Sequence, residues 1–365
     1  MNDFRNFGDE IRVPPVMQHS PQAGTKSRRR LLQLGAALPV AVCQCAASAK
    51  TPSGDVFQQL HRNSWYLPTA DGRARLYVTS LGRGPRVVVL HGGPGNNFHY
   101  LVDAVRRFAG QCEFVLFDQR GSLFSPVTHE NVPAMTLKTL AEDLEHLRRS
   151  LGGQRIVLFA HSFGALLALS YLDAHPERVA GLILTGTTPP STQESGGFEN
   201  MIRSSHGRLR VLRERPAVNE ALREAGVAGP TDSLSERQKH LRWKITQLAA
   251  INLYHVDRWS AIVGGGVHYN ARVDDAIGSS VPAQYDLTAR LQKIPVAIIQ
   301  GDNDYIDPGA KAWNKVVTSS TQVTVRVIHQ AGHYCWIDNP ASFDEAMEQA
   351  LARVTAPIRF SIPKP

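Results

Sequence analysis

An apolar run that leads into a small-residue turn around a serine constrains the fold of this chain more than any other feature. Residues 155–159 read Arg-Ile-Val-Leu-Phe and are followed by Ala160-His161-Ser162-Phe163-Gly164. This pentapeptide fits the pattern Gly-x-Ser-x-Gly, with alanine as the small residue in the first place. Small flanking residues let a chain reverse sharply between a strand and a helix. The sequence therefore predicts a buried strand, a turn with Ser162 at its tip, and a helix over 163–174.

Strand and helix patterns alternate on both sides of this turn. Continuous apolar runs, typical of strands buried on both faces, lie at 86–90, 113–117, 179–184, 295–300 and 323–328. Helical spacing of apolar residues is found at 98–108, 136–151 and 342–351. Two further strand patterns flank Asp71-Gly72 and predict a hairpin near the start of the folded part. This alternation predicts an α/β fold with a mostly parallel sheet flanked by helices.

The alternation stops at Thr187 and resumes after about residue 285. The stretch between is polar, rich in Arg and Glu, and mostly helical in pattern. We predict that residues 50–187 and 286–365 form one core and that 188–285 are an inserted helical cap. The alternative is a second independent domain. The strands and loops after residue 290 supply what the first half lacks, which favours an insertion.

The first 49 residues have the order of an export signal. Residues 27–33 resemble a twin-arginine motif, an apolar stretch follows at 34–42, and Ala-Ser-Ala at 47–49 fits a cleavage site. The apolar stretch is too short and too interrupted to favour a stable membrane anchor. We expect a periplasmic or secreted protein that begins near Lys50. A start at Met17 would leave the signal complete.

Composition restricts the class of partner. The chain has 365 residues, 42% of them hydrophobic, and a formal net charge of +8. The part of this charge that lies after residue 49 is +5, and it is spread along the sequence. Because no Lys and Arg cluster or nucleic-acid motif is present there, we expect no nucleic-acid partner. Cys112 and Cys335 would remain after the signal is removed, and their separate places in the fold favour two buried thiols over a disulfide. The oligomeric state is left open.

An acid and a histidine follow Ser162 in the chain order that acyl transfer on such a turn requires. The run 295–300 leads into Gly-Asp-Asn-Asp, which ends at Asp304. Carboxylates just past parallel strands lie at the edge of the sheet where sites are built. We predict Asp304 as the acid that orients the base, with Asp302 and Asp307 as alternatives.

The predicted base is His333, in a small-residue loop after the last strand. His329, at the end of that strand, is the alternative. The spacing of these two histidines could suit a metal ion, but no further ligand cluster accompanies them. We therefore expect neither a metal nor a cofactor.

Two backbone N–H groups are expected to hold the oxyanion. One belongs to Phe163, directly after the nucleophile, and the other to the loop His91-Gly92-Gly93-Pro94-Gly95. Glycines let the backbone of such a loop approach a substrate closely. Gly93 is the first candidate donor and Gly92 the second, since Pro94 has no N–H.

Together with the sequence Phe-Asp-Gln-Arg-Gly-Ser at 117–122, the loop 91–95 resembles the proline iminopeptidase group of α/β-hydrolases. The resemblance extends over roughly residues 64–355. It implies a serine hydrolase that cleaves an amide or ester bond of a small molecule or short peptide through an acyl-enzyme, as an aminopeptidase does. Asp118 to Gly121 are expected to shape the fold near the site and not to act on the substrate.

The cap departs from that group. Its members carry cap carboxylates for the free amine of the substrate, often in Trp-x-x-Trp-Glu, where this chain has Trp243-Lys244. Glu194 and Glu199 are the candidate substitutes, although both could be surface charges. The candidate wall residues, which could equally be cap core, are Trp243, Tyr254, Trp259 and Tyr269. Lys244 favours the alternative of a carboxylesterase, lactonase or amidase for a small apolar or anionic substrate. A non-catalytic binding protein is a third hypothesis.

Overall fold

A computed structural model describes residues 56–153, 155–262 and 268–359 of the chain. The predicted export signal lies outside these residues and stays a prediction. In the part of the chain that is described, no helix has the length and apolar character needed to span a membrane.

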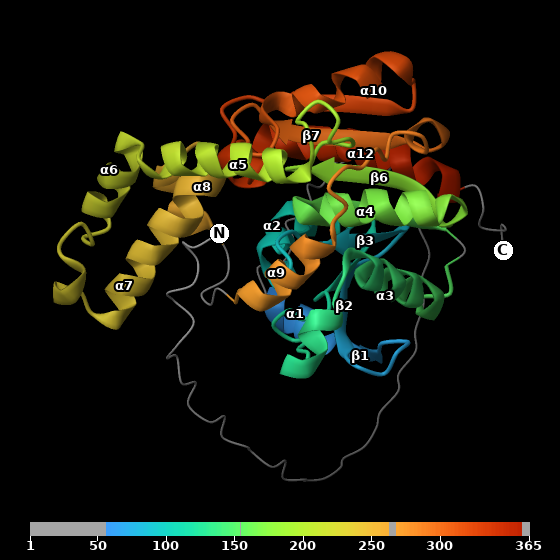
Figure 1. Cartoon of the computed structure of the whole chain (residues 1–365), viewed down its shortest axis with the longest axis horizontal. Helices are drawn as coiled ribbons and strands as arrows, with labels where there is room; N and C mark the ends of the chain where they lie inside the picture. The colour runs from blue at the N-terminus through green and yellow to red at the C-terminus, as the bar shows by residue number, and fades with distance from the viewer. Residues whose placement is uncertain (1–55, 154, 263–267, 360–365) are drawn as a thin grey trace, which may run out of the picture. The chain divides into compact units, whose positions relative to one another are not determined.

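The described residues contain one eight-stranded sheet in the order β1-β2-β4-β3-β5-β6-β7-β8 (Figure 1). Its strands are β1 (Trp65–Pro68), β2 (Arg75–Gly82), β3 (Arg86–Leu90), β4 (Glu113–Phe117), β5 (Ile156–His161), β6 (Val179–Thr185), β7 (Val296–Gly301) and β8 (Val323–Ile328). Strand β2 is antiparallel to β1 and to β4, and the other neighbours are parallel. The predicted hairpin and the mostly parallel α/β sheet are therefore confirmed.

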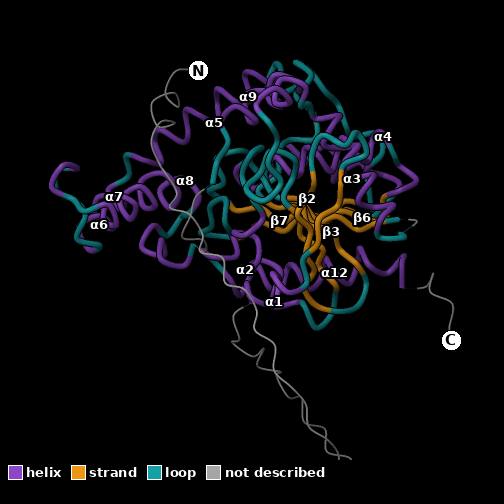
Figure 2. The backbone as a smooth tube through the Cα atoms, turned by 90° about the horizontal axis from the view of Figure 1, so that it is seen from below, coloured by secondary structure: helices purple, strands orange, loops and turns teal. Residues whose placement is uncertain are grey.

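Helices cover both faces of the sheet (Figure 2). On one face, α1 (Val56–Arg62), α2 (Val102–Val105) and α12 (Pro340–Arg359) pack against alternate strand residues such as Val89 and Phe159. On the other face, α3 (Leu137–Ser150), α4 (Phe163–Ala174) and α10 (Asn314–Ser319) pack against the residues between them, such as Leu90 and Leu158. Side chains of a strand point alternately to opposite faces, so each buried strand contributes to both cores.

Local sequence accounts for the start of α3 and for the burial of α4. The side chain of Thr136 accepts the N–H of Thr139 and caps α3, whose apolar side then faces the sheet. Helix α4 is apolar on nearly all sides and is almost wholly buried, as expected of a helix that fills the centre of a core.

Three elements differ from the sequence prediction. Helix α1 was not predicted, because in its seven residues only Leu60 is buried. The helix predicted over 98–108 is a series of short 3₁₀ and α turns. The last helix is longer than the predicted 342–351, since buried Val354 continues its apolar side against Gly181.

The described residues between β6 and β7 form helices: α5 (Phe198–Arg213), α6 (Pro216–Glu224), α7 (Glu236–Trp243), α8 (Ala250–Asn252) and α9 (Ala271–Ser280). A π-helical segment, Lys244–Ala249, joins α7 to α8. The two ends of this segment lie next to each other, because a β-bridge pairs Ser191 with Asp286. The boundaries predicted for the cap, 188–285, stay a prediction. Cys112 and Cys335 are buried and form no disulfide.

Candidate active site

The three residues predicted to carry the chemistry follow strands that end at the same edge of the sheet. Ser162 follows β5, Asp304 lies three residues beyond β7, and His333 comes after β8. These strands are parallel and only β6 lies between β5 and β7. Their carboxyl ends therefore lie at the same edge of the sheet, where parallel sheets place their sites.

Ser162 has a strained backbone. Its φ of 57° and ψ of −127° lie outside the regions that non-glycine residues favour, at a cost of about 1–3 kcal/mol. The turn is held because the Ser162 N–H donates to the carbonyl of Thr185, 3.1 Å away, and because α4 begins at the next residue. A strained residue that the surroundings hold in place is typical of a functional turn.

The loop after β3 passes directly over Ser162. A Cβ atom at Gly92 would lie 2.4 Å from the Cβ of Ser162, so only glycine fits there. A Cβ at Gly164 would lie 2.5 Å from the carbonyl oxygen of Leu90. The small residues of both motifs therefore let the serine turn and the loop 91–95 come into contact.

Asp304 and His333 form a buried pair. Nδ1 of His333 lies 2.6 Å from Oδ2 of Asp304, and both side chains are almost inaccessible to solvent. The other carboxylate oxygen of Asp304 accepts the N–H of Ile306 at 2.7 Å. A carboxylate on Nδ1 fixes the imidazole so that Nε2 faces the opposite way, which is the geometry of a general base.

The alternative residues lie elsewhere. Asp302 pairs with the exposed His329 at 3.3 Å and accepts the N–H of Ala331. Asp307 accepts the N–H of Ala312 at 3.1 Å, and burial raises the pKa of its carboxyl to about 6. His329 and His333 therefore bind different carboxylates.

Tyr305 was missed by the sequence analysis. Its ring packs against His333 with centroids 4.5 Å apart, and its hydroxyl lies beside the side chain of Ser162. Burial and the charge of Asp304 raise the pKa of Tyr305, so the hydroxyl stays protonated. Among the described residues no hydrogen bond joins Ser162 Oγ to His333 Nε2. The only signal in the sequence is that Tyr305 directly follows Asp304.

The two candidate oxyanion donors of the loop 91–95, Gly92 and Gly93, differ in their hydrogen bonds. The N–H of Gly92 donates to the Tyr100 hydroxyl at 2.7 Å, so it is already used. The N–H groups of Gly93 and Phe163 have no hydrogen-bond acceptor among the described residues. Gly93 has a φ of +62°, which glycine adopts without strain. Of the two candidates in the loop, Gly93 is therefore the one with a donor to offer.

His91 sets the direction of that donor. Its Nε2 accepts the N–H of Gln119 at 3.1 Å, so its proton is on Nδ1 and is donated to the carbonyl of Gly92, also at 3.1 Å. Burial lowers the pKa of His91 to about 4, which keeps the ring neutral at pH 7. In a trans peptide the carbonyl of Gly92 and the N–H of Gly93 point in opposite directions. Holding the carbonyl therefore aims the N–H.

The motif 117–122 surrounds this loop without reaching Ser162. Asp118 accepts the N–H groups of Phe98 and Phe124 at 3.2 and 2.9 Å, and the Gln119 amide donates to the carbonyl of His91 at 2.7 Å. Arg120 pairs with Asp71 of the hairpin turn and with Asp143 of α3. These contacts are of the kind expected for a fold-shaping role, which stays a prediction for residues 118–121.

The segment between β6 and β7 is attached to all three loops of the site. Arg208 of α5 donates to the carbonyls of Tyr305 and Ile306, at 2.5 and 2.8 Å. Asp338 accepts N–H groups from Tyr254, His255 and Gly332 at 2.8 to 2.9 Å, which joins the segment to the histidine loop. The N–H of Asn270, the N-cap of α9, donates to the carbonyl of Gly95 at 3.0 Å.

The structure does not place Glu194 and Glu199 as buried amine ligands. Glu194 pairs with Lys315, and Glu199, whose side chain is 88% exposed, pairs with Arg203. Trp243 is partly exposed and stacks on His240. Lys244 is partly buried, 5.8 Å from the ring centre of Trp259, and burial lowers its pKa.

Asp274 is a partly buried carboxylate of this segment that the sequence analysis did not select. It lies in the first turn of α9, accepts the Tyr269 hydroxyl at 2.7 Å, and has a pKa raised by burial. Its charge acts on the hydroxyl of Tyr305, which lies beside Ser162.

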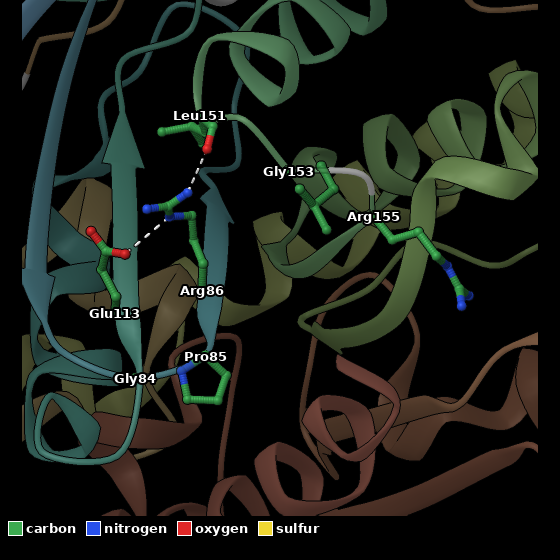
Figure 3. A pocket seen from close by; sticks show the side chains of 8 residues that line it. Gly84, Pro85, Arg86, Glu113, Leu151, Gly153 and Arg155 are labelled. Carbon is green, nitrogen blue, oxygen red and sulfur yellow. Dashed lines mark hydrogen bonds and ion pairs between the residues drawn. The ribbon is translucent and has the colours of Figure 1, made fainter. Parts of the chain in front are cut away.

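A pocket of about 210 Å³ lies at the opposite edge of the sheet (Figure 3). It is bordered by Arg86, Glu113 and Ile156, which begin β3, β4 and β5. Arg86 is already paired with Glu113 and donates to the carbonyl of Leu151. The pocket is therefore separate from the site around Ser162.

Comparison with known families agrees with this fold. A family model described as alpha/beta hydrolase fold matches residues 85–340. A proline iminopeptidase of Xylella fastidiosa is 42% identical over 120 residues, which are 32% of this chain and only 37% of that protein. A proline iminopeptidase of Lactobacillus helveticus is 25% identical over 280 residues, 73% of this chain and 90% of that protein.

Solved structures show the same fold. A proline iminopeptidase-related protein from Thermus thermophilus has a TM-score of 0.54 and 27% identity, over 80% of this chain and 97% of its own. An esterase from Thermogutta terrifontis has a TM-score of 0.53 and 23% identity, over 80% of this chain and 98% of its own. The second likeness supports the fold alone.

We predict that Gly92→Ala inactivates the protein without unfolding it. The new methyl group overlaps the Ser162 side chain and must displace the serine turn or the loop, and a shift of about 1 Å can cost about a hundredfold in rate. Turnover of a nitrophenyl ester, measured beside thermal unfolding, checks this. The matched control is Gly207→Ala in α5, where a Cβ meets nothing within 4 Å. Equal activity of the two variants would contradict the packing described here.

Proposed function

We propose, for a chain that belongs to the α/β-hydrolase fold family, that Ser162 is the nucleophile of a hydrolase that works through an acyl-enzyme. The observation that carries the proposal is the buried His333–Asp304 pair at the sheet edge where the strained Ser162 turn lies. In this role His333 is the general base and Asp304 holds its ring and stabilises the imidazolium.

The proposed reaction begins when the Ser162 side chain turns from Tyr305 toward Nε2 of His333. Such hydrogen bonds are often long or absent without substrate and tighten when it binds. Ser162 Oγ attacks the substrate carbonyl while His333 takes the proton. The N–H groups of Gly93 and Phe163 receive the developing oxyanion. His333 then protonates the leaving group, and a water molecule, activated by His333 in turn, releases the acyl group.

We further propose that the substrate carries a free amine, as for an aminopeptidase. The proline iminopeptidases among the relatives support this class. Asp274 supplies the charge that an ammonium group needs, near Tyr305 and Ser162. In this proposal Asp274 takes the place that the sequence analysis gave to Glu194 and Glu199, whose carboxylates are bound by Lys315 and Arg203.

A carboxylesterase, lactonase or amidase for an apolar or anionic substrate is the second candidate. Lys244 favours it, because a partly buried ammonium group next to the ring of Trp259 attracts an anion and repels an amine. The two candidates share the same nucleophile and differ only in the group that the helical segment recognises.

We expect the protein to cleave a prolyl or other aminoacyl anilide and to lose this turnover in Ser162→Ala. The experiment compares kcat/KM for the anilide with that for a short acyl nitrophenyl ester, on the same preparation. Brisk ester turnover without anilide turnover would replace the aminopeptidase by the second candidate. Turnover of either substrate by Ser162→Ala at the wild-type rate would remove the nucleophile assignment.

We predict that Asp274→Asn raises KM for the anilide about tenfold to a hundredfold, the size of one charge-assisted hydrogen bond of about 1.5–3 kcal/mol. Its kcat/KM for the uncharged ester should change less than about twofold. The control is Asp275→Asn, which removes the exposed neighbouring carboxylate of the same helix. An equal loss on ester and anilide would show that Asp274 supports the structure and does not bind the amine.

A further inference from the structure

A chain of hydrogen bonds joins the loop after β3 to the loop that carries His333. The N–H of Gly92 lies 2.7 Å from the Tyr100 hydroxyl, which lies 2.8 Å from Nδ1 of His161. Nε2 of His161 lies 3.2 Å from the carbonyl oxygen of His333. The chain therefore extends from the loop that offers the oxyanion donor to the backbone of the proposed base.

The chemistry of the groups fixes the direction of every bond in this chain. The Gly92 N–H can only donate, so the Tyr100 oxygen accepts from it. The His333 carbonyl can only accept, so Nε2 of His161 carries the proton of the ring, and the bare Nδ1 accepts the proton of Tyr100. Burial lowers the pKa of His161 well below its usual range and raises that of Tyr100, so neither group changes its charge near pH 7.

The surroundings leave little room for another arrangement. His161 is 1% exposed, and its ring centroid lies 4.4 Å from that of His333. Tyr100 stacks on Tyr334 at 5.2 Å. A Cβ at Gly186 would come within 2.7 Å of both His161 Nε2 and His333 Cε1. The two rings are therefore confined by packing as well as by hydrogen bonds.

The bond from Gly92 has a consequence for the oxyanion donor. With its N–H held by Tyr100 and its carbonyl held by His91, Gly92 has both of its polar groups engaged on the protein side. The N–H of Gly93 is left without an acceptor among the described residues. Without Tyr100, the Gly92 N–H would be a buried donor without a partner, and the loop would have to turn to satisfy it.

We infer that Tyr100 and His161 are positioning residues. They hold the oxyanion loop, residues 91–95, and the backbone of His333 at a fixed position relative to each other. The inference rests on the proposed acyl-enzyme function. Neither residue reacts: Tyr100 sets the orientation of the Gly92 peptide, and His161 ties the loop that carries His333 to the turn that carries Ser162. Loss of either bond misaligns groups that must act together on one carbonyl.

Four variants separate this role from simple packing. Tyr100→Phe and His161→Phe keep a ring in place and remove the hydrogen bonds. His161→Gln restores an acceptor and a donor, since its amide oxygen can accept from Tyr100 and its NH₂ can donate to His333. Tyr334→Phe is the matched control, because it removes a hydroxyl from the adjacent ring that makes no hydrogen bond among the described residues.

The measurements are kcat and KM for a short acyl nitrophenyl ester, per active site titrated with a fluorophosphonate, beside thermal unfolding. We expect kcat to fall about tenfold to a hundredfold in Tyr100→Phe and His161→Phe, with KM changed less than about threefold. On a logarithmic scale, His161→Gln should recover at least half of the kcat that His161→Phe loses. The kcat of Tyr334→Phe should stay within about twofold of that of the wild type.

The double variant gives a further check. Because both residues act through one chain, Tyr100→Phe combined with His161→Phe should lose little more than either alone. Additive losses, unchanged kcat in the single variants, or a His161→Gln variant no better than His161→Phe would overturn the inference. If the wild-type protein neither turns over the ester nor reacts with the fluorophosphonate, the proposed function fails instead.

Discussion

The fixed orientation of two consecutive peptides, His91–Gly92 and Gly92–Gly93, is the constraint on which the candidate site depends. Each is held at its protein-facing groups: the carbonyl of His91 by Gln119, the N–H of Gly92 by Tyr100, and the carbonyl of Gly92 by His91. The remaining group, the N–H of Gly93, is thereby aimed without any contact of its own. Preorganised donors of this kind need no rearrangement when charge develops on a substrate.

The same constraint explains why so much polar structure is buried around the site. The loop can lie on Ser162 only because Gly92 has no side chain. That contact requires the serine turn to stay in its strained conformation, and the strain is offset by the packing of β5 and α4 on both sides. Gln119 binds the carbonyl and the ring of His91, and its neighbours Asp118 and Arg120 fix the segment that carries it to Phe98 and Asp143.

The helical segment between β6 and β7 is part of this arrangement. Hydrogen bonds of Arg208, Asp338 and Asn270 attach it to the loops that follow β7, β8 and β3. In the proposed function, a substrate held by this segment would therefore be positioned against all three loops.

The order of strands and helices could be predicted from the sequence because buried parallel strands read as apolar runs with little ambiguity. Ser162, Asp304 and His333 could be selected because each follows such a run, and chain order fixes which loops meet. Single-sequence reasoning could not find Tyr305, Tyr100 or His161 as partners, since their contacts join segments that only the folded sheet edge brings together.

The helical segment was harder to interpret for a related reason. In a sequence, a charged residue of an amphipathic helix looks the same whether its side chain faces solvent or a site. Glu194 and Glu199 were selected for their place early in the segment, and they are ion-paired with Lys315 and Arg203. Asp274 could not be selected, because only the folded chain shows that Asn270, four residues before it, is bound to Gly95.

The central claim is that Ser162 attacks a carbonyl with the help of His333, and mapping a covalent adduct tests it most directly. The folded protein is treated with a fluorophosphonate, its intact mass is measured, and the modified residue is located by peptide mass spectrometry. The account predicts one adduct per chain, on Ser162, and a rate of labelling that falls at least about a hundredfold in His333→Ala. Labelling of another residue, or ester turnover by a protein whose Ser162 stays unmodified, would contradict it.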